Sequence, residues 1–339
     1  MSSTVPPHPH GVKPEGNLWL PGVADSARAK RSAGLGALAS LDDRCLLRIC
    51  GFLPPKDLAT LCVASDVLGA FASHEDFWRA ACVERAGGKP MVPFKGTWKA
   101  TCLGASARPW TRGVSVFSDV LYQTWELAHG SNGFGAQPSA YHPCERLAQD
   151  SGTAGPAFSA EYEAGLGRPV VFEGGGASAA ADAIWDQETL VKQVGDRILH
   201  SGGVNFRLHD YLDYAQSNTD DQPLYLFDPT FSQSCPELGA AYEAPTYFKD
   251  DLFDLLDKKS ADMDGRLDSP ASGSIGGSGT KKISAAAQKP GGGADSRPDY
   301  RWLLIGGLRS GQSWHKDPNN TSAWNLTLRG RKRWLFFPP

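Results

Sequence analysis

Apolar residues between positions 37 and 86 recur three or four places apart, which is the period of a helix with one buried face. In the first helix these positions are Cys45, Leu46, Ile49, Cys50 and Leu53. Ser40 and Asp43 are expected to cap helix N-termini. Pro54-Pro55 should end the first helix, and a second should begin near Leu58. The pattern predicts a small helical bundle that buries Phe71, Phe77 and Trp78.

The period changes to two near the end of the chain. Trp324, Leu326 and Leu328 alternate with Asn325, Thr327 and Arg329, which predicts a half-buried strand. Arg329-Gly330 is expected to turn the chain, and Lys332, Trp334 and Phe336 alternate on the returning strand. Such a hairpin would bring Asn325 and Lys332 together on one interior face.

Between these regions the sequence predicts short mixed elements and two unstructured stretches. We expect a strand at 167–174, a helix at 184–199, further elements at 206–214 and 223–228, and a helix at 250–256. Residues 1–35 are predicted to be a disordered tail. Residues 258–298, rich in Gly, Ser, Ala and Lys, are predicted to be a flexible low-complexity insertion. The fold class expected from the whole pattern is α+β.

Composition narrows the range of functions. The chain has 34 Lys and Arg against 37 Asp and Glu, a net charge of −3, so direct binding to nucleic acid is not expected. No run approaches the roughly 18 apolar residues of a membrane helix. Seven cysteines without a Cys-x-x-Cys pair favour free thiols in a reducing compartment, the nucleus or the cytoplasm. A short basic cluster at 28–31 fits either a localisation signal or a solvated tail.

One short motif carries candidate metal chemistry. His315 and Asp317 are two residues apart, which places both side chains on one face of an extended segment. Imidazole and carboxylate are two ligands of the two-histidine-one-carboxylate site for Fe(II). A lone His-x-Asp pair also occurs by chance, so the surrounding sequence matters. A buried Lys332 would need an anion, which the distal carboxylate of 2-oxoglutarate supplies with Asn325 donating a hydrogen bond. The alternative for the basic run 329–333 is a solvated or nucleic-acid-binding patch.

Residues 36–90 resemble an F-box. Leu41-Asp42, the turn Pro55-Lys56-Asp57-Leu58 and Trp78 match the marks of that family. Two marks are absent: the usual Pro before the first acidic residue, and the basic Arg-x-Trp that Asp66-Val67-Leu68 replaces. The resemblance implies docking on a Skp-type adaptor of a ubiquitin ligase, through Leu41, Leu46, Ile49 and Leu53. The alternative is a generic helical bundle. Residues 91–109 would be a connector.

From about residue 110 the chain resembles JmjC proteins, in the branch of the jumonji-type lysyl hydroxylase also described as an arginine demethylase. The similarity lies in RSGQSWHKDPNNTSAWNLTLRGRKRWLFFPP and, upstream, in RPVVFEG, DDQPLYLFD and PTYFKDDLFDLL. It implies a partial double-stranded β-helix, jelly-roll or cupin-like, with residues 110–257 as its N-terminal part and 299–339 as an incomplete core.

The same resemblance implies roles for individual residues. His315 and Asp317 would ligate iron, while Lys332, Asn325 and Tyr225 would hold 2-oxoglutarate; a structural role for Tyr225 is the alternative. Gln312 and Trp314 depart from the usual residues beside the histidine, so the substrate does not carry over.

The sequence is compatible with two functions. One is a Fe(II)- and 2-oxoglutarate-dependent oxygenase that hydroxylates or demethylates a protein substrate. The other is a non-enzymatic F-box adaptor that uses a degenerate JmjC fold for protein recognition. No histidine follows His315, so the third iron ligand is missing. We therefore expect these 339 residues to be a truncated form that binds iron weakly and is inactive alone.

Overall fold

The computed structural model describes residues 6–16, 23–106, 116–130, 144–148, 158, 162, 167–173, 183–201, 203–245, 248, 299–317 and 321–337. These residues form two compact units, each built from separated stretches of chain. The first comprises 1–143, 191–228 and 304–315, and the second 144–190, 229–303 and 316–339. Helices and strands occur together, as expected for an α+β protein. The predicted helix at 250–256 and the insertion at 258–298 lie outside the described residues.

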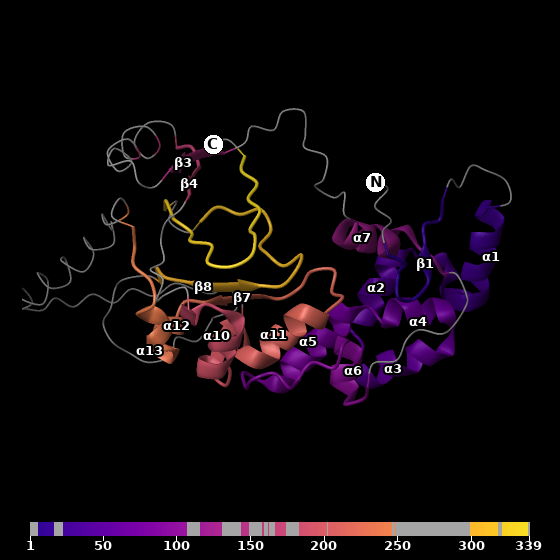
Figure 1. Cartoon of the computed structure of the whole chain (residues 1–339). Coiled ribbons are helices and arrows are strands. Elements are labelled where there is room, and N and C mark those ends of the chain that lie inside the picture. The colour runs from indigo at the N-terminus through magenta and orange to yellow at the C-terminus, as the bar shows by residue number, and fades with distance from the viewer. Residues whose placement is uncertain are drawn as a thin grey trace, which may run out of the picture. The chain divides into compact units, whose positions relative to one another are not determined.

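The first unit begins with the predicted helical bundle (Figure 1). Its helices are α2 (Asp43–Gly51), α3 (Pro55–Ala64), α4 (Asp66–Ala72), α5 (Glu75–Ala86) and α6 (Trp98–Leu103). α3 packs against α4, and α5 against α6. Phe71 and Trp78 are completely buried and Leu58 almost so, whereas Phe77 is only half-buried. The helical spacing therefore predicted this part of the fold correctly.

Local capping explains where the bundle helices begin. The Asp42 carboxylate accepts a 2.7 Å hydrogen bond from the Cys45 amide and caps α2. Pro55 occupies the first turn of α3, where its missing N–H leaves no bond unmade. The predicted caps Ser40 and Asp43 are wrong: the Ser40 hydroxyl donates to the Ala37 carbonyl, and Asp43 is buried inside α2.

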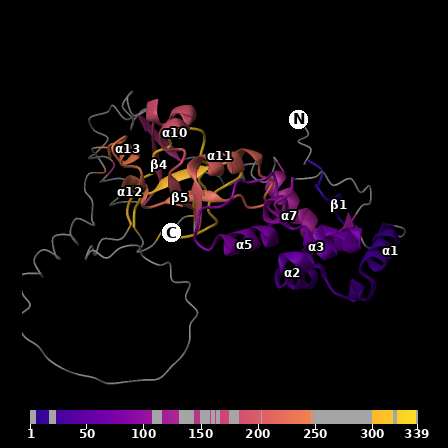
Figure 2. The ribbon, with the colours of Figure 1, turned by 90° about the horizontal axis from the view of Figure 1, so that it is seen from below.

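The N-terminal region is structured where it is described, so the prediction of a disordered tail is wrong there. α1 (Val23–Leu35) buries Ala27 and Leu35 and continues into a 3-10 helix, η1 (Gly36–Ser40). Figure 2 shows α1 at the edge of the bundle. Further upstream, β1 (Val12–Lys13) pairs in parallel with β2 (Val116–Phe117), which precedes α7 (Asp119–His129). Residues 12–13 pair with residues more than 100 positions away, and a local sequence pattern cannot predict such contacts.

The buried carboxylate of Asp43, in α2, has partners from α1 and from the start of α7. Arg31 of α1 forms an ion pair with this carboxylate and also donates to the Leu41 carbonyl at 2.5 Å. On its other side the Ser118 hydroxyl, at the start of α7, donates to Asp43 at 2.6 Å. Because both carboxylate oxygens have partners, the charge is tolerated inside the unit.

The rest of the first unit is a four-stranded sheet with one helix against it. The strand order is β6 (Val204–Arg207), β5 (Ile198–Ser201), β7 (Tyr225–Asp228), β8 (Leu303–Gly306). β5 and β6 are antiparallel, whereas β5 and β7 are parallel. α11 (Leu208–Ser217) lies beside β7 and β8 (Figure 1), and its buried Tyr211 hydroxyl hydrogen-bonds the Leu224 and Ile305 carbonyls. The predicted elements at 206–214 and 223–228 are thus a strand, a helix and a strand.

The second unit has a small sheet and an aromatic cluster. β3 (Glu145–Ala148) and β4 (Val170–Glu173) pair in parallel, so the strand predicted at 167–174 is confirmed, although it is half-buried rather than buried. Phe158, Phe172 and Phe248 pack edge to face, and Trp324 stacks on Phe248 with ring centroids 5.7 Å apart. α12 (Phe231–Ser234) and α13 (Pro236–Gly239) also belong to this unit.

One further expectation needs correction. Between 184 and 199 the chain forms α10 (Gln187–Val194) and then enters β5, so the helix is shorter than predicted. Within the described stretches the strands form one four-stranded and two two-stranded sheets, and the partial jelly roll stays a prediction. No helix among the described residues is long and apolar enough to cross a membrane.

Candidate functional site

The two expected iron ligands lie in a segment without regular structure. Residues 307–317 contain no helix or strand, so the extended segment expected for the His-x-Asp pair is not a sheet strand. His315 and Asp317 are both exposed, and the His315 Nδ1 atom lies 2.7 Å from the Ser313 carbonyl oxygen. His315 ends the first compact unit and Asp317 belongs to the second. Imidazole and carboxylate fit two ligands of an iron site. Over the described part of the chain, however, no three His, Cys, Asp or Glu side chains are grouped to hold a metal ion.

The predicted hairpin that was to carry the cosubstrate residues is not formed. Residues 321–337 contain no strand, and Asn325 and Lys332 are both exposed rather than interior. Gly330, with φ at +79°, does bend the chain where a turn was expected. The Lys332 ammonium lies over the Trp334 ring, 4.3 Å from its centroid, in a cation–π contact. Partial desolvation lowers the Lys332 pKa, although the side chain stays accessible to solvent.

Tyr225 lies in the first unit, on β7, with its side chain half-buried. Its ring sits over Gly306 of β8 so closely that a Cβ there would come within 3.2 Å of two ring carbons. Burial raises the Tyr225 pKa, so the hydroxyl is a neutral hydrogen-bonding group at physiological pH. This packing gives the tyrosine a structural role, and its expected contact with the cosubstrate stays a prediction.

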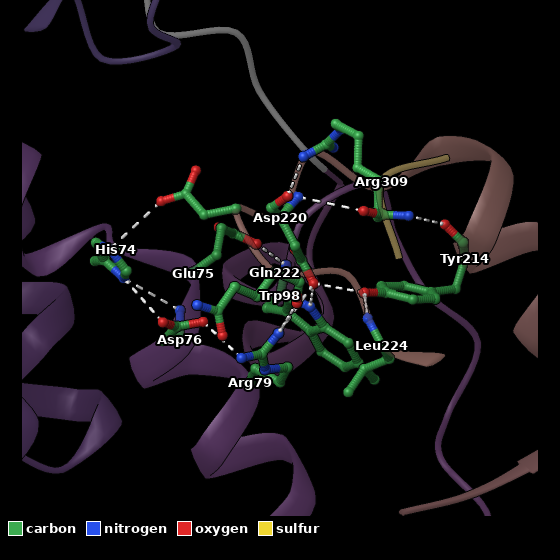
Figure 3. A network of polar contacts seen from close by, with 12 residues as sticks. His74, Glu75, Asp76, Arg79, Trp98, Tyr214, Asp220, Gln222, Leu224 and Arg309 are labelled. Carbon is green, nitrogen blue, oxygen red and sulfur yellow. Dashed lines mark hydrogen bonds and ion pairs between the residues drawn. The ribbon is translucent and has the colours of Figure 1, made fainter. Parts of the chain in front are cut away.

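A buried polar network in the first unit was not predicted from the sequence (Figure 3). Its centre is Asp220, in the loop between α11 and β7, with 1% of its surface exposed. One carboxylate oxygen accepts hydrogen bonds from the Trp98 indole at 2.7 Å and the Tyr214 hydroxyl at 2.6 Å, with an Arg79 nitrogen 3.5 Å away. These contacts therefore link α5, α6 and α11 to the same buried carboxylate.

The network continues through backbone groups of the same loop. Arg79 donates to the Gln222 carbonyl at 2.8 Å, and the Leu224 amide donates to the Tyr214 hydroxyl at 2.8 Å. Arg309 donates to the Asp220 carbonyl at 2.6 Å. Arg309 has φ at +70°, a conformation uncommon for a residue with a side chain. Arg309 thus anchors the start of the segment that leads to His315.

Burial dominates the electrostatics of this network. Desolvation raises the pKa of Asp220 and of Asp221, against the opposing effects of Trp98, Tyr214 and nearby cations. Glu75, at the start of α5, has its pKa raised to about 7 by desolvation, although its carboxylate accepts a hydrogen bond from the Trp98 amide. Desolvation likewise lowers the Arg309 pKa. These groups hold the loop in place; none of them lies in the predicted metal or cosubstrate set.

The sequence carried little signal for this network. Asp220 is 122 positions from Trp98, and no local period links them. Asn218 and the adjacent acids Asp220-Asp221 are residue types that are common in turns and loops, so their identity alone does not indicate burial. Only the folded chain shows that one of the two acids is buried and shared.

Comparison with known proteins gives the evolutionary context. No protein-family model matches the chain. It is 31% identical over 349 residues to the arginine-specific demethylase JMJ22 of Arabidopsis thaliana, a match that covers all of this chain and 60% of JMJ22. It is 30% identical over 326 residues to the lysine-specific demethylase JMJ21 of the same plant, covering 92% of this chain and 30% of JMJ21.

A shorter match reaches an animal protein. Over 179 residues, half of this chain, it is 31% identical to the bifunctional arginine demethylase and lysyl-hydroxylase psr-1 of Caenorhabditis elegans, of which it covers 36%. The homologues of this chain are JmjC-type arginine and lysine demethylases. The sequence spans less than two thirds of the length of each of these relatives. Because the match to JMJ22 covers the whole chain, it includes the N-terminal helical region as well as the His315 segment.

Proposed function

We propose that the protein is a Fe(II)- and 2-oxoglutarate-dependent oxygenase that acts on methylated arginine or on lysine side chains of other proteins. The observation that carries this proposal is 31% identity, over the whole chain, to an arginine-specific demethylase. A second match, to a relative that is both a demethylase and a lysyl hydroxylase, supports the same chemistry on two side chains.

In this proposal His315 and Asp317 provide a neutral imidazole and a carboxylate to the metal. Lys332 neutralises the distal carboxylate of 2-oxoglutarate, and Asn325 and Tyr225 donate hydrogen bonds to it. When bound, the iron and its cosubstrate supply the oxidation of a substrate C–H bond. Since His315, Asp317, Asn325 and Lys332 are exposed in the described structure, loading the site requires these side chains to converge on the ligands.

Hydroxylation and demethylation start from the same oxidation and differ in the carbon attacked. An oxidised N-methyl carbon is lost as formaldehyde, whereas an oxidised lysine side-chain carbon keeps its oxygen. The natural protein should therefore be incubated with Fe(II), 2-oxoglutarate and two peptide sets, one with methylated arginines and one with lysines. Succinate, formaldehyde and the gain of one oxygen atom in the peptide are measured by mass spectrometry.

Matched variants test whether His315 and Asp317 are required for succinate formation. His315→Ala and Asp317→Ala should abolish succinate formation, while Lys316→Ala, the exposed residue between them, should leave it within two-fold. Succinate formation that survives both ligand substitutions would contradict the proposal.

We also propose that the helical bundle docks on a Skp-type adaptor, and exposed apolar side chains on α2 and α3 and at the C-terminal cap of α2 favour this second role. Ile49 is 42% exposed, Phe52 79% and Val63 69%, and the exposed Arg48 and Lys56 lie on the same two helices. Apolar groups of this size at the surface, with basic neighbours, suit an acidic protein partner.

Leu46, expected in this interface, is instead 3% exposed and belongs to the interior of the bundle. Leu41 and Leu53 are half-buried. A protein that binds the adaptor and releases no succinate would favour the non-enzymatic adaptor role over the oxygenase.

A further inference from the structure

Residues 6–16, which we call the N-terminal strap, bring two histidines into an aromatic and basic cluster. The His8 ring lies 5.1 Å from the ring of Trp125 on α7 and 5.7 Å from that of His10. The His129 ring stacks on that of Trp125, with centroids 3.5 Å apart. The strap thus contacts the Trp125–His129 stack through His8.

Hydrogen bonds near both ends of the strap hold it on the first unit. The Trp125 indole donates to the Pro6 carbonyl at 2.8 Å, and the Glu15 amide donates to the Asp119 carboxylate at 2.8 Å. Between them, the strap pairs with β2 over two residues only, with Val12 opposite Val116. Both valines are buried. A segment with so short a ladder opens more readily than the bundle core.

The titratable neighbours of the two strap histidines are basic. His8 is acted on by His10 of the strap, by His74 at the start of α5 and by His129 of α7; His10 by His74 and by Lys99 of α6. His74 itself has two acidic neighbours, because its nitrogens lie 3.8 Å from Asp76 and 3.9 Å from Asp221. Positive charge on His8 or His10 is repelled by the basic groups around these two rings.

We propose that protonation of His8 and His10 releases the N-terminal strap from α7, so that the strap is an acid-sensitive cover of the Trp125–His129 face. The geometry gives the reason. The His8 Nδ1 atom accepts a 3.1 Å hydrogen bond from the His10 amide, so the neutral ring carries its proton on Nε2. Adding a proton to Nδ1 breaks this bond and sets two N–H groups against each other.

The direction and range of the effect follow from linkage. Burial, followed by the neighbouring bases, lowers the pKa of His8 to about 3 and that of His10 to about 4. In the released strap both rings return to the ordinary histidine pKa of about 6.5. Docking is therefore at full strength above pH 6.5 and weakens as the pH falls below it. Between pH 7.5 and 5.5 the docking equilibrium should fall roughly ten-fold for each histidine, and so roughly 100-fold for both.

Hydrogen exchange of the 339-residue chain tests this. The Val116 amide donates to the Gly11 carbonyl and the Ser118 amide to the Lys13 carbonyl, so both report strap docking from outside the strap. After correction for the intrinsic effect of pH on exchange, their protection should fall roughly 100-fold from pH 7.5 to 5.5, while peptides of α3 stay protected.

The matched variants replace each ring by a side chain that keeps an acceptor but does not titrate. His8→Asn/His10→Asn should lose the pH dependence, whereas His209→Asn, at a half-exposed site on α11, should keep it. Protection that is unchanged between the two pH values in the wild type, or that falls equally in the double variant, would overturn the proposal. If the double variant is released at both pH values, each single variant must still show a weaker, roughly ten-fold dependence; a 100-fold dependence in either would overturn it.

Discussion

The indole N–H of Trp98 donates a 2.7 Å hydrogen bond to the carboxylate of Asp220. Trp98 starts α6 of the helical bundle, and Asp220 lies in the loop before β7 of the sheet. This bond, with those of Tyr214 and Arg79 to the same carboxylate, ties the N-terminal bundle to the sheet that precedes the His315 segment.

Removing the Asp220 carboxylate should destabilise the protein strongly. Asp220→Ala leaves the buried Trp98 indole and Tyr214 hydroxyl without their acceptor, and we expect a loss of about 3 kcal/mol in the free energy of unfolding. Chemical denaturation measures this. Asp213→Ala, at an exposed position of α11, is the control and should change the same quantity by less than about 0.5 kcal/mol. Equal effects of the two would show that the network is not important for stability.

Arg31 should matter through the buried Asp43. Arg31→Ala removes the ion pair and leaves the Asp43 carboxylate with the Ser118 hydroxyl, at a cost of about 2 kcal/mol. The control is Arg28→Ala, three residues earlier on α1 and exposed. Thermal unfolding should separate the two variants clearly; identical melting temperatures would contradict the role given to Asp43.

Glu75 should make stability fall as the pH rises toward neutrality. Its pKa in the folded chain is about 7, above the model-compound value of 4.5, so the folded state keeps its proton between these values while the unfolded state loses it. The contribution of Glu75 to the stability of the folded state is fully present below pH 4.5 and is lost as the pH rises through 7. The total is roughly 3 kcal/mol for a shift of this size.

Glu75→Gln should remove that pH dependence, and Glu84→Gln, at an exposed position of α5, should retain it. Urea midpoints at a series of pH values give the comparison. A stability that changes between pH 5 and 7 by the same amount in the two variants would contradict a half-buried, protonated Glu75.

Lys332 and Arg331 provide a matched pair for the proposed cosubstrate site. Lys332→Ala should weaken 2-oxoglutarate binding by roughly 10- to 100-fold, because it removes the charge opposite the distal carboxylate. Arg331→Ala should have less than a two-fold effect. Calorimetric titration of the natural protein with 2-oxoglutarate, under oxygen-free conditions, measures both. Comparable losses would favour the basic-patch alternative.

Leu46 and Phe52 should separate adaptor binding from folding. Leu46→Asp puts a charge into the bundle interior and should unfold it, whereas Phe52→Asp changes a side chain that is 79% exposed and should leave helix content intact. If the bundle docks through its exposed face, Phe52→Asp abolishes capture of the Skp-type adaptor. Normal capture by a folded Phe52→Asp protein would rule out this face.

The sequence by itself determined the helical bundle and the short elements around the sheet. α2 and α3 appear where the apolar period and Pro54-Pro55 placed them, because a helix satisfies its backbone within its own residues. Trp78 and Phe71 were recognisable as core residues for the same reason. The chain's homologues support the oxygenase-like function that the His-x-Asp pair suggested, and the ligand role of that pair stays a prediction.

Only the tertiary structure decided the burial of Asp220, the ordering of the N-terminal strap and the state of residues 321–337. The alternation around Asn325 and Lys332 predicted strands, but a strand needs a partner to bond its backbone, and the described residues there have none in a sheet. Val12 pairs with Val116, and Trp98 with Asp220, across more than 100 positions. Contacts at such separations depend on how the chain folds back on itself, which no local period encodes.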